Sequence, residues 1–146
     1  MKSLLIIMLL VLTSCASDDV IDYSKEKKVL EVQHIKKNGK LPPQKIMGEQ
    51  TLYIRQKLVK LGPKMKWCYE KRQLNVEKVS GSVDVSFTIN SKGRVRKAKA
   101  TSKQDFKPIM LKCVKGVISM ERFKKPYGGG SVEVKQPFNF HPEISK

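Results

Sequence analysis

The sequence predicts one small α+β domain whose elements follow the order helix, strand, strand, helix, strand. Two kinds of pattern carry this prediction. Residues 80–101 and 131–140 contain runs of alternating apolar and polar side chains, as strands with one buried face do, whereas residues 46–72 and 105–123 space their apolar side chains as helices do. The length of 146 residues fits one domain with appendages.

An N-terminal leader precedes these elements. Lys2 is followed by nine consecutive apolar residues, Leu4–Leu12, which are too few to span a bilayer because a spanning helix needs about 20. The next residues, Leu12-Thr13-Ser14-Cys15, resemble the lipobox of bacterial lipoproteins. The resemblance implies that residues 1–14 are removed as a signal peptide and that Cys15 becomes the N-terminus, where three fatty chains such as palmitate would anchor it permanently. The alternative is an ordinary secretory peptide with an incidental cysteine.

The residue after Cys15 indicates whether such a lipoprotein stays in the inner membrane or moves to the outer membrane. A signal for retention in the inner membrane typically places Asp there, whereas this chain has Ala16. The lipoprotein resemblance therefore implies the outer membrane, with the protein facing the periplasm.

Residues 15–45 are interpreted mainly as a tether, because they hold little that could build a core and are punctuated by Asn38-Gly39 and Pro42-Pro43. Residues 29–35 leave open one short helical turn or strand against the domain. Residues 46–141 are the predicted domain, and residues 142–146 are a tail. The chain has 30 Lys and Arg against 13 Asp and Glu, a net charge of +17, and since residues 16–34 are slightly acidic the domain is the basic part.

Two helices are expected ahead of the hairpin. The first follows from the apolar residues Leu52, Ile54, Leu58, Val59 and Leu61, and Gly62-Pro63 interrupts it. Pro63 suits the first turn of a second helix, in which Met65, Cys68, Tyr69 and Arg72 share a face. The alternative is that Gly62 only kinks one helix.

A β-hairpin is the clearest feature of the sequence. Val83, Val85, Phe87 and Ile89 alternate with polar residues, Asn90-Ser91-Lys92-Gly93 supplies a turn, and a second extended run covers Arg94–Ala100. Because an isolated hairpin is at best marginally stable, we expect helices to cover its apolar face.

A helix and a strand complete the predicted domain. Asp105 is a plausible N-cap, Pro108 fits the first turn, and the apolar residues from Ile109 to Ile118 form one stripe. Ser131–Phe140 is predicted to be a strand with Val132, Val134, Phe138 and Phe140 on one face. Because Pro137 cannot donate a ladder hydrogen bond, this strand is expected at an edge of the sheet.

Two cysteines remain once Cys15 is assigned to lipid. Cys68 and Cys113 each fall on the inward face of a predicted helix, and the periplasm is oxidising, so we expect a disulfide between them. The alternative is a pair of buried reduced thiols. A CxxC redox motif is absent, and His34 and His141 are poorly placed for a metal site, so no metal and no cofactor are expected.

A family resemblance rests on several of these segments together. They are Trp67-Cys68-Tyr69-Glu70, Gly81–Ile89, Gly93-Arg94-Val95, Cys113-Val114, Phe123 and Gln136-Pro137-Phe138-Asn139-Phe140. Over about residues 60 to 141 the arrangement resembles the C-terminal domain of the AgmX/PglI type, which is related to the TonB C-terminal fold. The resemblance implies a three-stranded antiparallel sheet with helices on one face. It does not extend to energy transduction, because this chain lacks the transmembrane helix and the long proline-rich span of TonB.

The function expected from these observations is a non-catalytic adaptor. The resemblance implies that an extended segment of an envelope protein adds to the last strand, in an assembly of the kind that serves motility or transport. The residues predicted to bind it are Ser131, Val132, Glu133, Val134, Lys135 and Gln136.

The alternative function is a basic binder of anionic envelope surfaces, such as lipopolysaccharide phosphates, anionic lipid or polysaccharide. Its predicted patch consists of Lys92, Arg94, Arg96, Lys97, Lys99 and Lys103, although a lysine-rich face is often only solvated. Nucleic acid is not expected, because no aromatic side chains interleave with these residues. An enzyme is not expected either, because neither histidine has a nucleophile in a recognisable arrangement.

Overall fold

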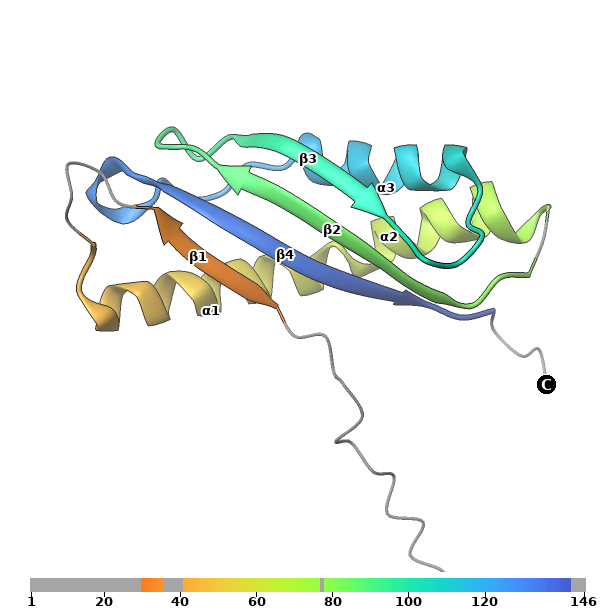
Figure 1. The fold of residues 1–146 in the computed structure, drawn as a ribbon, viewed down its shortest axis with the longest axis horizontal. Helices are drawn as coiled ribbons and strands as arrows, with labels where there is room; N and C mark the ends of the chain where they lie inside the picture. Colours follow the sequence, from red (N-terminus) through yellow and green to blue (C-terminus); the bar gives the residue numbers. More distant parts are fainter. Residues whose placement is uncertain (1–29, 36–40, 77, 143–146) are drawn as a thin grey trace, which may run out of the picture.

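The protein folds as one layer of helices packed on one face of an antiparallel sheet (Figure 1). The computed structural model describes residues 30–35, 41–76 and 78–142. Their elements are β1 (Glu31–Ile35), α1 (Gln44–Lys60), α2 (Gly62–Tyr69), a π-helical turn (Glu70–Leu74), β2 (Gly81–Ile89), β3 (Val95–Thr101), α3 (Pro108–Ser119), a 3-10 turn (Tyr127–Gly129) and β4 (Ser131–Phe140). The predicted α+β class and the order helix, strand, strand, helix, strand are therefore confirmed for residues 44–140.

The sheet has four strands where the resemblance implied three. The additional strand is β1, which lies inside the segment interpreted mainly as a tether and is the short strand that residues 29–35 left open. The strand order is β1-β4-β2-β3. β1 pairs antiparallel with one side of β4, from Glu31 opposite Lys135 to Ile35 opposite Ser131. The other side of β4 pairs with the whole length of β2, from Gly81 opposite Phe140 to Ile89 opposite Val132. The prediction that the last strand lies at an edge of the sheet is therefore wrong for its first half.

The predicted hairpin is confirmed. Gly93 takes a φ of +74°, a left-handed conformation that glycine adopts without strain, and the Asn90 side-chain oxygen accepts hydrogen bonds from the N–H groups of Lys92 at 3.0 Å and Arg94 at 2.9 Å. In β3 one extra residue is inserted, since Ser86 lies opposite Lys99 but Thr88 lies opposite Arg96. This β-bulge places Lys97 at a φ of 52°.

Prolines and backbone hydrogen bonds set where the helices begin and end. The Leu61 N–H donates to the carbonyls of Leu58 and Val59 and ends α1, and Pro63 stands in the first turn of α2, so Gly62-Pro63 separates two helices. Asp105 is not the N-cap of α3. Lys107 takes that position with a φ of −61° and a ψ of 138°, because Pro108 opens the helix and a residue before proline favours an extended backbone.

The core lies between the sheet and the helices. Buried side chains on alternate positions of β2 and β4 pack against buried side chains on all three helices: Val83, Val85, Phe87, Ile89, Val132, Val134 and Phe140 from the strands, and Ile54, Leu58, Met65, Tyr69, Met110, Val114 and Ile118 from the helices. Cys68 and Cys113 form the predicted disulfide, which joins α2 to α3 with 5.7 Å between their Cα atoms. Gln73 is fully buried, and its side-chain oxygen accepts the Lys107 N–H at 2.7 Å, which fixes the start of α3.

Several expectations concern residues whose structure is not described. Cys15 and the proposed signal peptide, residues 1–14, belong to this group, as do residues 143–146 of the proposed tail. Among the described residues, none of the helices has the length and apolar character needed to cross a membrane.

Candidate functional site

The first half of β4, predicted to bind a partner, is already paired on both sides. β1 covers the backbone of Ser131–Lys135, so a partner strand would have to displace β1 to reach it. The Lys135 ammonium lies 3.1 Å from a Glu31 carboxylate oxygen across this pair of strands. Strand addition at Ser131, Val132, Glu133, Val134 and Lys135 is therefore not available in this fold, and the physical reason is that the chain supplies its own edge strand.

The second half of β4 differs, because β1 does not reach it. In the described chain, residues 136–140 pair with β2 on one side and with no strand on the other. Pro137 falls here and offers no N–H, and its carbonyl accepts a hydrogen bond from the Gln136 side chain at 2.6 Å. Pro137, which predicted an edge strand, thus does lie at an edge of the sheet. Its backbone, however, is poorly suited to pairing with another strand.

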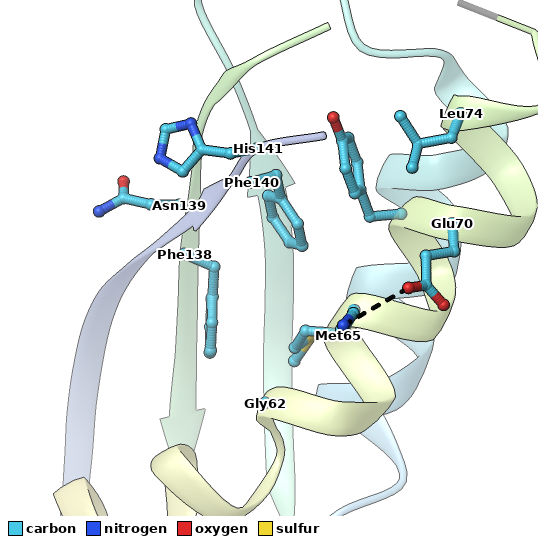
Figure 2. Close-up of a pocket in the computed structure, with 10 residues that line it drawn as sticks. Gly62, Met65, Glu70, Leu74, Phe138, Asn139, Phe140 and His141 are labelled. Carbon is cyan, nitrogen blue, oxygen red and sulfur yellow. Dashed lines mark ion pairs between the residues drawn. The ribbon is translucent and has the colours of Figure 1, made fainter. Parts of the chain in front are cut away.

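A groove runs between this half of β4 and α2 (Figure 2). Phe138 and Phe140 project from the strand toward Met65 of the helix, while Gly62 and Leu74 line its two ends. The groove has a volume of about 410 Å³, which is within the range of ligand-binding clefts. Its two walls come from segments more than 60 residues apart, which is why sequence patterns did not reveal it.

The base of the groove is rigid. Tyr69 packs against Phe140 with ring centres 5.3 Å apart, and Phe106 makes edge contacts with both rings. The Tyr69 hydroxyl donates to the Val79 carbonyl at 2.7 Å, and burial raises the pKa of this phenol. The hydroxyl therefore stays protonated and serves to hold the ring in place.

The rim of the groove is polar. Lys66 and Glu70, one helical turn apart, form an ion pair of 3.7 Å beside the apolar walls, and His141 follows the strand side. The Asn139 side chain, between Phe138 and Phe140 in β4, points away from the helix (Figure 2). The lining residues thus combine an apolar interior with one cation and one anion at the opening. Such an arrangement suits the binding of an apolar side chain that belongs to a polar chain.

No cluster for a metal ion is present in the described ranges, where groups of three or more His, Cys, Asp or Glu side chains do not occur. His34 lies in β1 and His141 follows β4, so the two histidines belong to different parts of the sheet edge. A buried Nε2 atom of His34 has no hydrogen-bond partner.

The predicted basic patch is divided by the fold. Arg96 and Lys99 lie on the face of the sheet opposite the helices, because their partners Thr88 and Ser86 alternate with the buried side chains of β2. Lys97 stands at the bulge of β3 beside a hollow that also includes Lys115. Lys103 follows the far end of β3.

The other two residues of the predicted patch, Lys92 and Arg94, lie at the hairpin turn. Their neighbours include a basic loop that is distant in the sequence. Arg94 forms an isolated antiparallel bridge with Arg122, which brings the turn against the loop between α3 and β4. Arg122, Lys124 and Lys125 were therefore missed as members of a basic cluster. Their spacing in the sequence shows a basic run, but only the long-range bridge joins that run to the hairpin.

The fold was compared with known proteins. No family model matches the sequence, and no curated protein matches it either. Two solved structures are similar in fold to this chain, both C-terminal domains of TonB. The domain from Pseudomonas aeruginosa has 15% sequence identity and a TM-score of 0.36, with 79% of this chain and 90% of that chain covered. The domain from Helicobacter pylori has 17% identity and a TM-score of 0.38, with 73% of this chain and 99% of that chain covered.

Proposed function

We propose that this protein is a lipoprotein of the outer membrane that faces the periplasm and acts as a non-catalytic adaptor in a cell-envelope assembly. In this proposal the groove between α2 and the second half of β4 holds an extended segment of another envelope protein. The observation that carries the proposal is the position of the groove: it lies beyond Glu31, the first residue of β1, where β4 has no second neighbouring strand in the described chain.

The groove supports recognition by side chains more than by backbone pairing. Pro137 lacks a donor and its carbonyl is bonded within the chain, so few backbone groups remain for a ladder. The partly exposed Phe138 offers apolar contact instead, beside the buried side chains of Met65 and Phe140. The partner segment we propose carries one or two bulky apolar side chains that enter the groove, with polar residues on either side that meet Lys66 and Glu70.

The membrane anchor in this proposal is Cys15. Its support is the lipobox resemblance of Leu12-Thr13-Ser14-Cys15. Because β1 belongs to the sheet, the chain between Cys15 and the domain is about half as long as the tether of residues 15–45 that the sequence predicts. A chain of about 15 residues spans at most about 50 Å, so the anchor would keep the domain near the bilayer.

In-cell photo-crosslinking tests this proposal. A photoreactive side chain is placed at Lys66 or Phe138, on the two sides of the groove, and at the exposed control positions Gln56 on α1 and Ser119 on α3. The proposal predicts one discrete adduct that forms from both groove positions and is absent from both controls. Adducts of equal yield from all four positions, or none from the groove positions, would contradict it.

A further inference from the structure

The hairpin turn and the loop after α3 form one rigid surface at the end of the sheet. The Phe123 N–H donates to the Gly93 carbonyl at 2.9 Å, and Arg94 bridges to Arg122. The Lys124 N–H donates to the Tyr53 hydroxyl at 3.1 Å, so the loop is also fixed to α1. We call this the tip surface. Its members are the exposed cations Lys92, Arg94, Arg122, Lys124 and Lys125.

Among the described residues, no carboxylate forms an ion pair with the cations of the tip surface. Arg94 and Arg122 lie directly opposite each other, an arrangement that destabilises a strand pair when both residues carry the same charge. The neighbouring carboxylate, Glu121, is already engaged, since its two oxygens lie 3.2 Å from the Lys57 ammonium and 2.8 Å from the Lys64 ammonium. Burial opposes ionisation of Glu121, but the hydrogen bonds and charges of Lys64 and Lys57 lower its pKa below the usual value. An anion bound between the two arginines would relieve their repulsion.

Exposed apolar side chains stand on both sides of this loop. Met120 is 84% exposed at the end of α3, and Tyr127 is 54% exposed just after Lys125. Cations combined with exposed apolar and aromatic side chains are typical of surfaces that rest on a bilayer, where the cations meet lipid phosphates and the apolar groups enter the headgroup region. A soluble polyanion would pair with the cations but would leave the apolar side chains exposed to water.

We propose that the tip surface binds the phosphate groups of anionic phospholipids at a bilayer surface, with Arg94 and Arg122 holding a phosphate between them. The inference does not require the groove to bind a protein, nor Cys15 to carry lipid. It gives the domain a preferred orientation, because the tip and the groove lie toward opposite ends of β4: Ile89 pairs with Val132 beside the tip, and Gly81 pairs with Phe140 beside the groove.

Vesicle co-sedimentation tests the proposal with protein that starts at Ala16 and therefore carries no lipid. This form keeps the whole fold, since the core residues lie between Leu30 and Phe140. Vesicles of phosphatidylglycerol and phosphatidylcholine in equal parts are compared with phosphatidylcholine alone, at about 0.1 M salt so that distant charges are screened. The matched variants are Arg94→Gln with Arg122→Gln, and Arg96→Gln with Lys99→Gln, which remove the same charge from the tip surface and from the open sheet face.

The expected result is binding to the anionic vesicles only, weakened about tenfold by the tip pair and less than about threefold by the sheet-face pair. Absence of binding to anionic vesicles, or equal weakening by both pairs, would overturn the proposal. The variant Met120→Ser with Tyr127→Ser separates a bilayer from a soluble polyanion. It should weaken vesicle binding while leaving retention on immobilised heparin unchanged, and unchanged vesicle binding would overturn the assignment to a bilayer.

Discussion

Glu31 of β1 lies opposite Lys135 of β4, and the pairing of the two strands begins there. Toward the C-terminus of β4 the strand continues through Pro137 to Phe140 with β2 as its neighbour. One register position therefore divides β4 into a half that the chain closes by itself and a half that borders the groove. The location of the proposed binding site follows from this division.

The disulfide is expected to supply a large part of the stability of so small a domain. Cys68 and Cys113 close a loop with a sequence separation of 45. In the chain-entropy model, a loop of that size corresponds to about 4 kcal/mol, so the double variant Cys68→Ala with Cys113→Ala should lower the free energy of unfolding by about 2–5 kcal/mol. Denaturant unfolding measures this, with reduced wild-type protein as the control for cavity effects. If oxidised and reduced wild type unfold at the same denaturant concentration, the disulfide contributes nothing.

Gly93 should tolerate no side chain. It has a positive φ, and a Cβ atom built on it would overlap the Phe123 carbonyl oxygen, so Gly93→Ala adds strain and a clash with backbone. Gly128 has a similar φ of +70° but open space around the Cβ position, which makes Gly128→Ala the matched control. We expect Gly93→Ala to destabilise the domain by about 2 kcal/mol or more and Gly128→Ala by about 1 kcal/mol. Equal losses in thermal unfolding would mean that the contact with Phe123 is not rigid.

His34 should make the stability of the domain depend on pH. Burial lowers the pKa of this imidazole and outweighs a hydrogen bond with the Met47 backbone, which acts in the opposite direction. The unfolded chain then binds a proton more readily than the native state, so the free energy of unfolding falls as the pH drops below about 6.5. The lowered pKa of Glu121 does not produce this effect. A carboxyl group with a lowered pKa changes the free energy of unfolding only as the pH falls below the pKa of that group in the unfolded chain.

Thermal unfolding at about pH 7.5 and about pH 5 measures this dependence. The decrease in midpoint should be smaller in His34→Gln than in the wild type. Identical decreases in the two proteins would show that other groups are responsible.

Membrane anchoring predicts a simple loss on mutation of one residue. Cys15→Ala should release the protein from the membrane fraction and abolish its labelling by a fatty acid, because the thiol that would be acylated is gone. Fractionation of cells that express the wild type and the variant measures both effects. Label that persists on the variant would contradict the anchor.

Local patterns were enough to predict most of the elements and the disulfide. The alternation of Val83, Val85, Phe87 and Ile89 and the stripe that includes Met110, Val114 and Ile118 describe which side chains are buried. The inward placement of Cys68 and Cys113 followed from the same helical spacing. These features depend on neighbours within one element, which a single sequence contains.

The pairing of distant segments was not predictable in the same way. β1 has only five residues, and its partner strand lies about 100 residues later, so nothing near β1 indicates its place in the sheet. Pro137 correctly suggested an edge, but it could not show that the first half of β4 is covered. The groove, and the contact of Arg94 with Arg122, likewise join segments that no local pattern connects.

The groove is the proposed binding site of the partner, and a side chain that fills it should block binding. Gly62 lines the groove and has no atom within 4 Å of its Cβ position, so Gly62→Phe should occupy the space that a partner side chain needs. Gly48 in α1 is equally open but lies outside the groove, which makes Gly48→Phe the matched control. Because Gly62 precedes Pro63 and a Cβ there disfavours the helical backbone, Lys66→Trp serves as a second way to fill the groove.

The most direct measurement is the affinity of each variant for the protein captured by crosslinking, with thermal unfolding recorded in parallel. We expect Gly62→Phe and Lys66→Trp, while still folded, to bind about tenfold or more weakly, a loss of about 1.4 kcal/mol, whereas Gly48→Phe should bind like the wild type. Full affinity in folded Gly62→Phe and Lys66→Trp would show that the partner is held elsewhere and that the groove is not its site.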